Sequence, residues 1–453
     1  MNTLISINPA TDEKLGEVET STPQEIRATV EKAHNAQLSW NNLGVSGRLE
    51  ELKKLYDYFV SHHDELSLIE TKEMGKPISD NLDWALGQFK WNLENAEASL
   101  APVTTFENDT EIHKIYYEPY GVVASITPWN FPLSNFIMGA LQPLIAGNTV
   151  VYKISEEVPL FGKALDKAWH EAGLPTGVFN QVYGDGNVGK QLAESDINFI
   201  HFTGSSEVGK SLYKIAAEKF IPITLELGGS DAGIVFEDAN IDSIIEDIFW
   251  SKFINCGQLC CGLKRLFVHS SKYDELLEKL KNYISQVKVG DTEDPETSLG
   301  CLVSKKQLNI LNSQIEDAKS KGVDVIIGGE IMNRKGSYYK PTLLTNITKD
   351  MNIFYEEIFG PVLPITKFEK EDEAIKLAND TPYGLSAYIF TNDKDKALKV
   401  SKQLKAGSIS HNGVDYSNPA NPFGGYKGSG LGKTCGKVGL QHCCQIKTIS
   451  LSK

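Results

Sequence analysis

The pattern of apolar and polar positions changes near residue 115. Before it, residues 23–39 and 46–71 carry apolar side chains at helical spacing, which predicts two amphipathic helices. After it, short apolar runs bounded by glycine or proline alternate with helical stretches. The runs predict strands, and the stretches between them predict helices. The strands cover residues 121–126, 149–153, 178–183, 199–203, 223–227 and 233–236, and the helices cover 134–146, 159–172, 187–195 and 206–219.

A second series of the same kind follows a long predicted helix at about 240–254. Its predicted strands cover residues 265–269, 323–327, 362–368 and 387–390. Alternating strands and helices favour a mostly parallel sheet, and a chain of 453 residues exceeds the size of one hydrophobic core. The sequence therefore predicts an α/β protein with two doubly wound α/β domains that join near residue 228. Ligands of such sheets bind beyond the carboxyl ends of the strands.

Charge and cysteine usage narrow the class of protein. The formal net charge of −14 argues against nucleic acid or an anionic membrane surface as the main partner. No apolar run reaches the ~20 residues of a membrane span, and the first residues do not resemble a signal peptide. The seven cysteines are odd in number and include no Cys-x-x-Cys pair. We therefore expect reduced thiols, no metal site and a cytoplasmic location.

Two glycine-rich loops each indicate a nucleotide site, one typical of dinucleotides and the other typical of nucleoside triphosphates. Residues 184–189 read Gly-x-Gly-x-x-Gly between a predicted strand and a predicted helix, which favours a dinucleotide. Residues 204–211 fit the phosphate-binding loop of NTP-binding proteins, but Glu207 places negative charge where phosphate would bind. Gly204 and Ser205 still stand at a helix start that can bind an anion, so both loops can serve one dinucleotide. Either loop alone could also be a simple turn.

Three polar residues in unusual settings are candidates for catalysis. Cys260 follows a predicted helix in a loop, where a thiol can act as a nucleophile; the alternative is a small buried apolar residue. Glu226 interrupts an apolar strand, and burial would raise its pKa as a general base requires; the alternative is a structural salt bridge. Asn130 stands in the segment PWNFP, and its amide can donate to an oxyanion; the alternative is an ordinary turn.

Together these segments resemble the aldehyde dehydrogenase superfamily over essentially the whole chain. They occur in the order and rough spacing of that family, which makes the set far more specific than any one segment. The matching segments are residues 128–132 (PWNFP), 147–153 (GNTVVYK), 202–205 (FTGS), 225–229 (LELGG), 257–260 (GQLC), 356–361 (EEIFGP) and 422–427 (PFGGYK).

The resemblance implies a role for each residue. Cys260 falls on the position of the nucleophile, Asn130 and the Cys260 backbone N–H on the oxyanion hole, and Glu226 on the base for deacylation. Hydride would leave for the cofactor, and a thioester on Cys260 would remain. The cofactor-binding residues so implied are Lys153 and Glu357 at the riboses, Ser205 at the pyrophosphate, Gly186 and Gly189 near the adenosine half, Phe359 at the nicotinamide, and also Trp129, Thr203 and Gly204.

Glu156 indicates which cofactor is used. It stands three positions after Lys153, where the family contacts the adenosine ribose. A carboxylate there accepts a hydrogen bond from a 2′-hydroxyl and repels a 2′-phosphate. We therefore expect NAD rather than NADP.

The chain resembles best the short bacterial succinate-semialdehyde dehydrogenase branch, in the segment LELGGSD at 225–231 and the ending at 439–448. This implies succinate semialdehyde as substrate, with another small aliphatic or aromatic aldehyde as the alternative. Two departures stand out. Ile254 replaces an arginine that longer relatives place six residues before the nucleophile, with Lys90 or Lys427 as candidate substitutes. Lys433 and Thr434 replace the family's Arg-Glu.

The same resemblance divides the chain. It implies a dinucleotide-binding domain over 1–102 and 120–228, a catalytic domain over 229–430, and a small β extension for oligomerisation from 103–119 and 440–453. Strand-like alternation within both parts of the extension agrees with this, since unpaired edges are usually covered. We expect a homodimer or a homotetramer. A catalytically silent relative is the remaining alternative, against which the complete set of catalytic residues argues.

Overall fold

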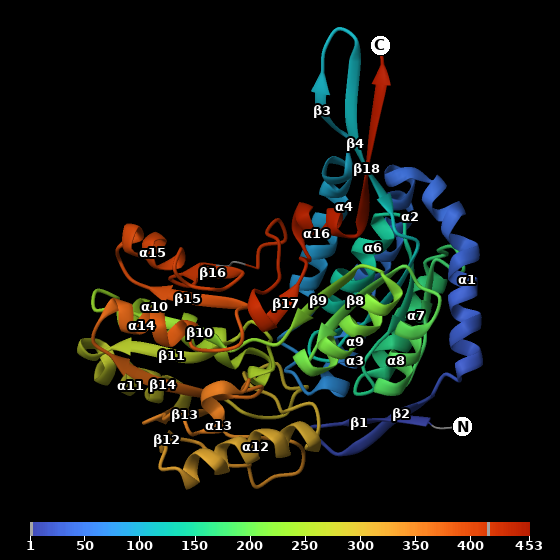
Figure 1. Cartoon of the computed structure of the whole chain (residues 1–453). Coiled ribbons are helices and arrows are strands. Elements are labelled where there is room, and N and C mark those ends of the chain that lie inside the picture. Colours follow the sequence, from blue (N-terminus) through green and yellow to red (C-terminus); the bar gives the residue numbers. More distant parts are fainter. Residues whose placement is uncertain (1–2, 415–416) are drawn as a thin grey trace.

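A computed structural model describes residues 3–414 and 417–453 of the chain. Two α/β bodies lie side by side, and a narrow arm of strands projects from one of them (Figure 1). Within the described residues, the strands form sheets of six, seven, three and two strands. This arrangement confirms the predicted fold class.

The N-terminal segments pack around the first body. Strands β1 (Thr3–Asn8) and β2 (Glu13–Glu19) form an antiparallel hairpin, which α1 (Pro23–Asn42) follows. The prediction of one helix over 46–71 is wrong, because the chain breaks at His62 into α2 (Gly44–Ser61) and α3 (His63–Met74). At His62 the backbone leaves the helical region, with φ −113° and ψ 23°, and the His62 ring contacts the Tyr58 carbonyl at 2.9 Å. The apolar pattern did not predict α4 (Asp83–Leu100), which packs against α2.

The first body is built on a sheet in the order β17-β9-β8-β5-β6-β7, parallel except for β17. Its five parallel strands confirm the predicted ones. The strands are β5 (Val122–Ile126), β6 (Thr149–Lys153), β7 (Phe179–Gln181), β8 (Phe199–Gly204), β9 (Ile223–Leu227) and β17 (Gly430–Leu431). The helices are α5 (Pro132–Phe136), the π-helical η1 (Ile137–Leu141), α6 (Gln142–Ile145), α7 (Pro159–Glu171), α8 (Gly186–Glu194) and α9 (Ser206–Lys219).

The second body is built on a sheet in the order β12-β13-β14-β11-β10-β15-β16, parallel except for β12. The short strands β13 and β16 were not predicted. The strands are β10 (Asp231–Val235), β11 (Leu263–His269), β12 (Asp324–Ile327), β13 (Thr342–Thr345), β14 (Val362–Phe368), β15 (Ser386–Phe390) and β16 (Ser408–His411). The helices are α10 (Ile241–Phe253), α11 (Ser270–Ser285), α12 (Lys305–Ser320), α13 (Asn352–Tyr355), α14 (Glu371–Asn379) and α15 (Lys394–Ser401).

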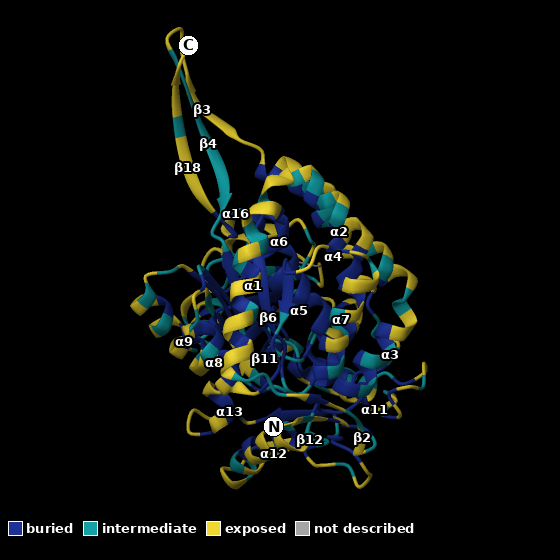
Figure 2. Ribbon diagram, turned by 90° about the vertical axis from the view of Figure 1, so that its right-hand side faces the viewer, coloured by how far each residue is buried: buried dark blue, intermediate teal, exposed yellow. Residues whose placement is uncertain are grey.

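The projecting arm is an antiparallel sheet in the order β18-β4-β3. It combines β3 (Val103–Glu107) and β4 (Glu111–Pro119) with β18 (Cys444–Ser452), which follows helix α16 (Gly436–His442). Strand β18 pairs with β4 over its whole length. The residues of β3 and most of those of β18 are exposed (Figure 2). In the described part of the chain, no helix is both long enough and apolar enough to span a membrane.

The two sheets place their polar segments at one location. The segment PWNFP follows the carboxyl end of β5, and the turn into α9 follows that of β8. Glu226 is the penultimate residue of β9, and Cys260 lies in the loop just before β11 of the other sheet. Residues from all four places line one cavity, as expected for ligands at strand ends.

Candidate active site

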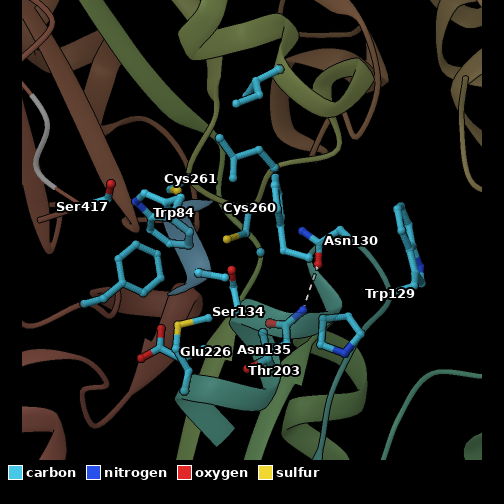
Figure 3. A pocket seen from close by; sticks show the side chains of 18 of the residues that line it. Trp84, Trp129, Asn130, Ser134, Asn135, Thr203, Glu226, Cys260, Cys261 and Ser417 are labelled. Atoms are coloured by element: carbon cyan, nitrogen blue, oxygen red, sulfur yellow. Dashed lines mark hydrogen bonds between the residues drawn. The ribbon is translucent and has the colours of Figure 1, made fainter. Parts of the chain in front are cut away.

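A cavity of about 650 Å³ lies between the two sheets. Cys260, Asn130 and Glu226 all lie around it (Figure 3). Nine of the expected site residues line it: Trp129, Asn130, Thr203, Gly204, Ser205, Glu226, Cys260, Glu357 and Phe359. The other four, which are Lys153, Glu156, Gly186 and Gly189, are not among its lining residues. They lie farther along the strand ends of the first sheet.

The loop before Cys260 has an unusual backbone. Helix α10 ends at Phe253, and the turn η2 (Ile254–Gly257) follows. Asn255, Cys256 and Gly257 have φ angles of 51°, 54° and 74°, all in the left-handed region. A Cβ at Gly257 would lie 2.2 Å from the Gly360 carbonyl oxygen, so only glycine fits there. Such a conformation costs about 1 kcal/mol or more at a non-glycine residue and needs support from its surroundings.

Hydrogen bonds supply that support and join the loop to the segment PWNFP. The Asn255 side chain donates to the Asn130 carbonyl at 2.8 Å, and the Asn130 side chain donates to the Gln258 carbonyl at 3.1 Å. The Gln258 side chain in turn donates to the Asn255 carbonyl and accepts from the Val303 N–H. Sequence reasoning missed Asn255 and Gln258, because nothing in the motif indicates which partners their amides find.

Cys260 is half-buried and lies beside Cys261. The Cys261 side chain, burial and the Glu357 carboxylate together hold the pKa of the Cys260 thiol well above its usual range, while Lys264 acts in the opposite direction. These surroundings therefore disfavour the thiolate, the form in which a cysteine acts as a nucleophile. Cys256 and Cys261, which flank Cys260 in the chain, are both buried, and neither forms a disulfide.

Glu226 is a buried carboxylate, with 3% of its surface exposed. The Thr434 hydroxyl donates to its Oε1 at 3.3 Å, and its Oε2 has no hydrogen-bond partner among the described residues. Burial raises the pKa of Glu226 well above its usual range, and the positive charge of Lys433 offsets part of this rise. The arrangement suits a base that accepts a proton near neutral pH.

Glu357 and Phe359 both contact Lys264, a residue that the sequence analysis did not single out. The Lys264 Nζ lies 3.6 Å from Glu357 Oε1 and 4.7 Å from the centre of the Phe359 ring. It also donates to the Leu259 carbonyl at 2.6 Å, next to the nucleophile. Its signal in the sequence was a lysine within the apolar strand β11. Trp129 packs edge-on against Phe359, with ring centres 5.5 Å apart.

The residues at the strand ends of the first sheet fit a dinucleotide. Ser205 caps α9 by accepting from the Val208 N–H, and the first turn of such a helix offers further N–H groups to a phosphate. Lys153 pairs with Glu156 at 3.1 Å at the end of β6. A Cβ at Gly189 would lie 3.8 Å from Lys153 Cδ, so α8 begins beside this pair. Charged groups that could bind riboses and N–H groups that could bind phosphates thus lie along the carboxyl edge of the first sheet.

The phosphate-binding-loop alternative does not fit this geometry. Helix α9 begins at Ser206, so Gly209 and Lys210 belong to a helix and not to a loop. A Cβ at Gly209 would lie 2.6 Å from Leu227 Cδ2, so this glycine serves the packing of α9 on β9. Lys210 is exposed and is not among the residues that line the cavity.

Comparison with known proteins gives matches over nearly the whole chain. Residues 2–449 match the aldehyde dehydrogenase family. The chain is 34% identical to the NADP(+) succinate-semialdehyde dehydrogenase of Escherichia coli over 97% of this chain and 92% of that protein. It is 37% identical to a betaine aldehyde dehydrogenase of Cereibacter sphaeroides over 98% of this chain and 92% of that protein. The NAD+ complex of an aldehyde dehydrogenase from Bacillus cereus has a TM-score of 0.95 at 35% identity, covering 100% of this chain and 93% of that chain.

The family match is consistent with the chemical groups that line the cavity. A thiol, an amide donor and a buried carboxylate surround one space at the meeting point of two α/β sheets. The chain belongs to the aldehyde dehydrogenase family.

Proposed function

We propose that this protein oxidises an aldehyde to a carboxylic acid with NAD, through a thioester on Cys260. One observation carries the proposal. Cys260, Asn130 and Glu226 line the same cavity as Ser205 and Phe359, so the reacting groups and the expected cofactor site are contiguous.

The first half of the reaction uses Cys260 and Asn130. The Cys260 Sγ bonds to the carbonyl carbon, the thiol proton passes to water, and the carbonyl oxygen becomes an oxyanion. One Nδ2 hydrogen of Asn130 is bound to the Gln258 carbonyl, which leaves the second for the oxyanion. A bound NAD+, which Ser205, Lys153 and Glu357 would hold, would supply the acceptor for the hydride that leaves the tetrahedral carbon with its electron pair. The carbon–oxygen double bond forms again, and a thioester remains on Cys260.

The second half uses Glu226. Its carboxylate takes a proton from a water molecule, whose oxygen attacks the thioester carbon. The carbon–sulfur bond then breaks, the carboxylic acid leaves, and the sulfur recovers a proton. Because burial raises the pKa of Glu226, its basic strength exceeds that of an exposed carboxylate.

The preference for NAD rests on Glu156. Its carboxylate contacts Lys153, which neutralises the lysine that would otherwise attract a 2′-phosphate. Relatives of the chain are named for either cofactor: the Escherichia coli protein for NADP(+), and the Bacillus cereus structure for its NAD+ complex. Glu156 therefore supports NAD for this chain.

The substrate has two candidates. The sequence resemblance implies succinate semialdehyde, and the Escherichia coli relative carries that name. Other relatives are named for betaine aldehyde and glutarate semialdehyde, at 37% and 34% identity. The names alone therefore leave the aldehyde open.

The cavity lining favours the second candidate, an uncharged small aliphatic or aromatic aldehyde. Lys76 is the only basic residue among the described lining residues, and it already lies 3.2 Å from Glu70. Neither Lys90 nor Lys427 lines the cavity. Without a cation, a buried substrate carboxylate would cost several kcal/mol. The apolar lining residues include Trp84, Leu133, Met138, Ile254, Ile310, Val414 and Phe423.

The division of the chain and its assembly remain our proposals. Strand pairing supports a dinucleotide-binding part over 1–102 and 120–228 and a catalytic part over 229–430, since the first holds the six-stranded sheet except for β17 and the second holds the seven-stranded sheet. The arm from 103–119 and 440–453 supports a homodimer or a homotetramer, because Val103, Phe106, Ile446 and Leu451 are exposed on it. A reducing compartment such as the cytoplasm suits an enzyme none of whose cysteines forms a disulfide.

Replacing Cys260 by serine tests the proposed chemistry. The variant should lose about a thousandfold or more in kcat for NADH formation with any aldehyde, because a hydroxyl is a far weaker nucleophile. Cys443→Ser is the matched control, since Cys443 is buried outside the cavity and should leave the rate near that of the parent. A Cys260→Ser enzyme as fast as the parent would disprove the mechanism.

Replacing Glu156 by serine tests the cofactor preference. The ratio of kcat/KM for NAD to that for NADP should fall by about tenfold, because one negative charge near the 2′-phosphate is removed. Glu194→Ser, at the far end of α8, serves as control and should keep the parent ratio. A parent enzyme that prefers NADP would contradict the assignment of NAD.

Replacing Ile254 by arginine tests the substrate. The parent should have a higher kcat/KM for propanal or benzaldehyde than for succinate semialdehyde. Ile254→Arg should raise kcat/KM for succinate semialdehyde by about tenfold, through a new charge-assisted contact, and lower it for the uncharged aldehydes. Ile254→Leu should change neither. A parent enzyme that strongly prefers succinate semialdehyde would overturn the inference from the lining.

A further inference from the structure

The segment Lys433-Thr434, which departs from the family's Arg-Glu, lies against the proposed base. The Thr434 hydroxyl donates to Glu226 Oε1, and the backbone of Thr434 is bridged to Phe423 by two hydrogen bonds. Strand β17, immediately before this segment, pairs with β9 so that Gly430 stands opposite Glu226. The segment is therefore held at a fixed position beside the carboxylate.

Gly424 leaves the gap across which Lys433 and Glu226 face each other. A Cβ at Gly424 would lie 2.8 Å from Glu226 Oε1 and 3.0 Å from Lys433 Cδ. Both side chains therefore border the space that a side chain at position 424 would fill. The Lys433 Nζ donates to the Gly424 carbonyl, which holds the ammonium group near this gap while the side chain stays half-buried.

Lys433 is the cation with the largest effect on Glu226. The other groups that face the carboxylate are the Thr434 hydroxyl and the thiols of Cys261 and Cys435. None of these carries a positive charge. With one oxygen unbonded and little solvent, the ionised form of Glu226 has little other support.

We propose that Lys433 is a positioning residue that stabilises the ionised form of Glu226 across the Gly424 gap, and so makes it available as the base for deacylation. This inference rests on the proposed role of Glu226. The sign of the effect follows from charge. Removing the positive charge of Lys433 should raise the pKa of Glu226 further. As the pH falls, the Glu226 carboxylate should therefore be protonated, and stop acting as a base, at a higher pH than in the parent.

The test measures deacylation alone. The enzyme is acetylated on Cys260 with p-nitrophenyl acetate, and the loss of the acetyl group is followed by the mass of the intact protein across a range of pH. In the parent, the rate should rise with pH through the pKa of Glu226, and Glu226→Gln should be slow throughout. Lys433→Met should move this rise about one pH unit upward, which is about tenfold slower decay on the acidic side.

Two further variants separate charge from structure. Lys433→Arg keeps the charge and should restore the parent pH profile. Lys437→Met removes an exposed lysine nearby in α16 and should leave the profile unchanged. An unmoved profile in Lys433→Met, or an equal loss at every pH in both Lys433 variants, would overturn the inference. Failure of the parent to be acetylated on Cys260 would instead contradict the proposed function.

Discussion

Two hydrogen bonds between the sheets fix the reacting groups relative to each other. Asn255 donates to the Asn130 carbonyl at 2.8 Å, and Asn130 donates to the Gln258 carbonyl at 3.1 Å. Asn130 follows a strand of the six-stranded sheet, while the loop with Asn255 and Gln258 precedes a strand of the seven-stranded sheet. A shift of one sheet against the other would break both bonds at once. The positions of Asn130 and of the loop that carries Cys260, the proposed oxyanion donor and nucleophile, therefore depend on the same contact that joins the two bodies.

Burial makes the chemistry of this site possible and also restricts it. Cys260 and Glu226 both have raised pKa values, so each is held in its neutral form more strongly than in water. Neighbouring cations offset this: Lys264 beside the cofactor edge and Lys433 beside the base. Because these lysines have partners already, they offer no free charge to a substrate carboxylate. The same low polarity that strengthens the base therefore favours an uncharged aldehyde.

The sequence predicted the parallel strands of the first sheet and four of those of the second, β10, β11, β14 and β15, because their apolar runs are bounded by glycine and proline. It did not predict the short parallel strands β13 and β16. The sequence did not predict features that depend on local backbone geometry or on contacts between distant segments. The backbone leaves the helical region at His62, but the apolar spacing on both sides of it predicts a single helix. The site residues near strand ends were predictable from their motifs, but the contact between Lys264 and Glu357 joins distant segments. For the same reason, the sequence could not reveal that Lys433 lies across a glycine from Glu226.

The most direct test of this account is to trap the acyl group during turnover. The enzyme is mixed with NAD and an aldehyde, quenched rapidly in acid, digested and analysed by peptide mass. The account predicts an added acyl mass on the peptide that contains Cys260, and fragmentation should locate it on that sulfur. An acyl group on Cys256 or Cys261, or none on any cysteine while NADH forms, would contradict it.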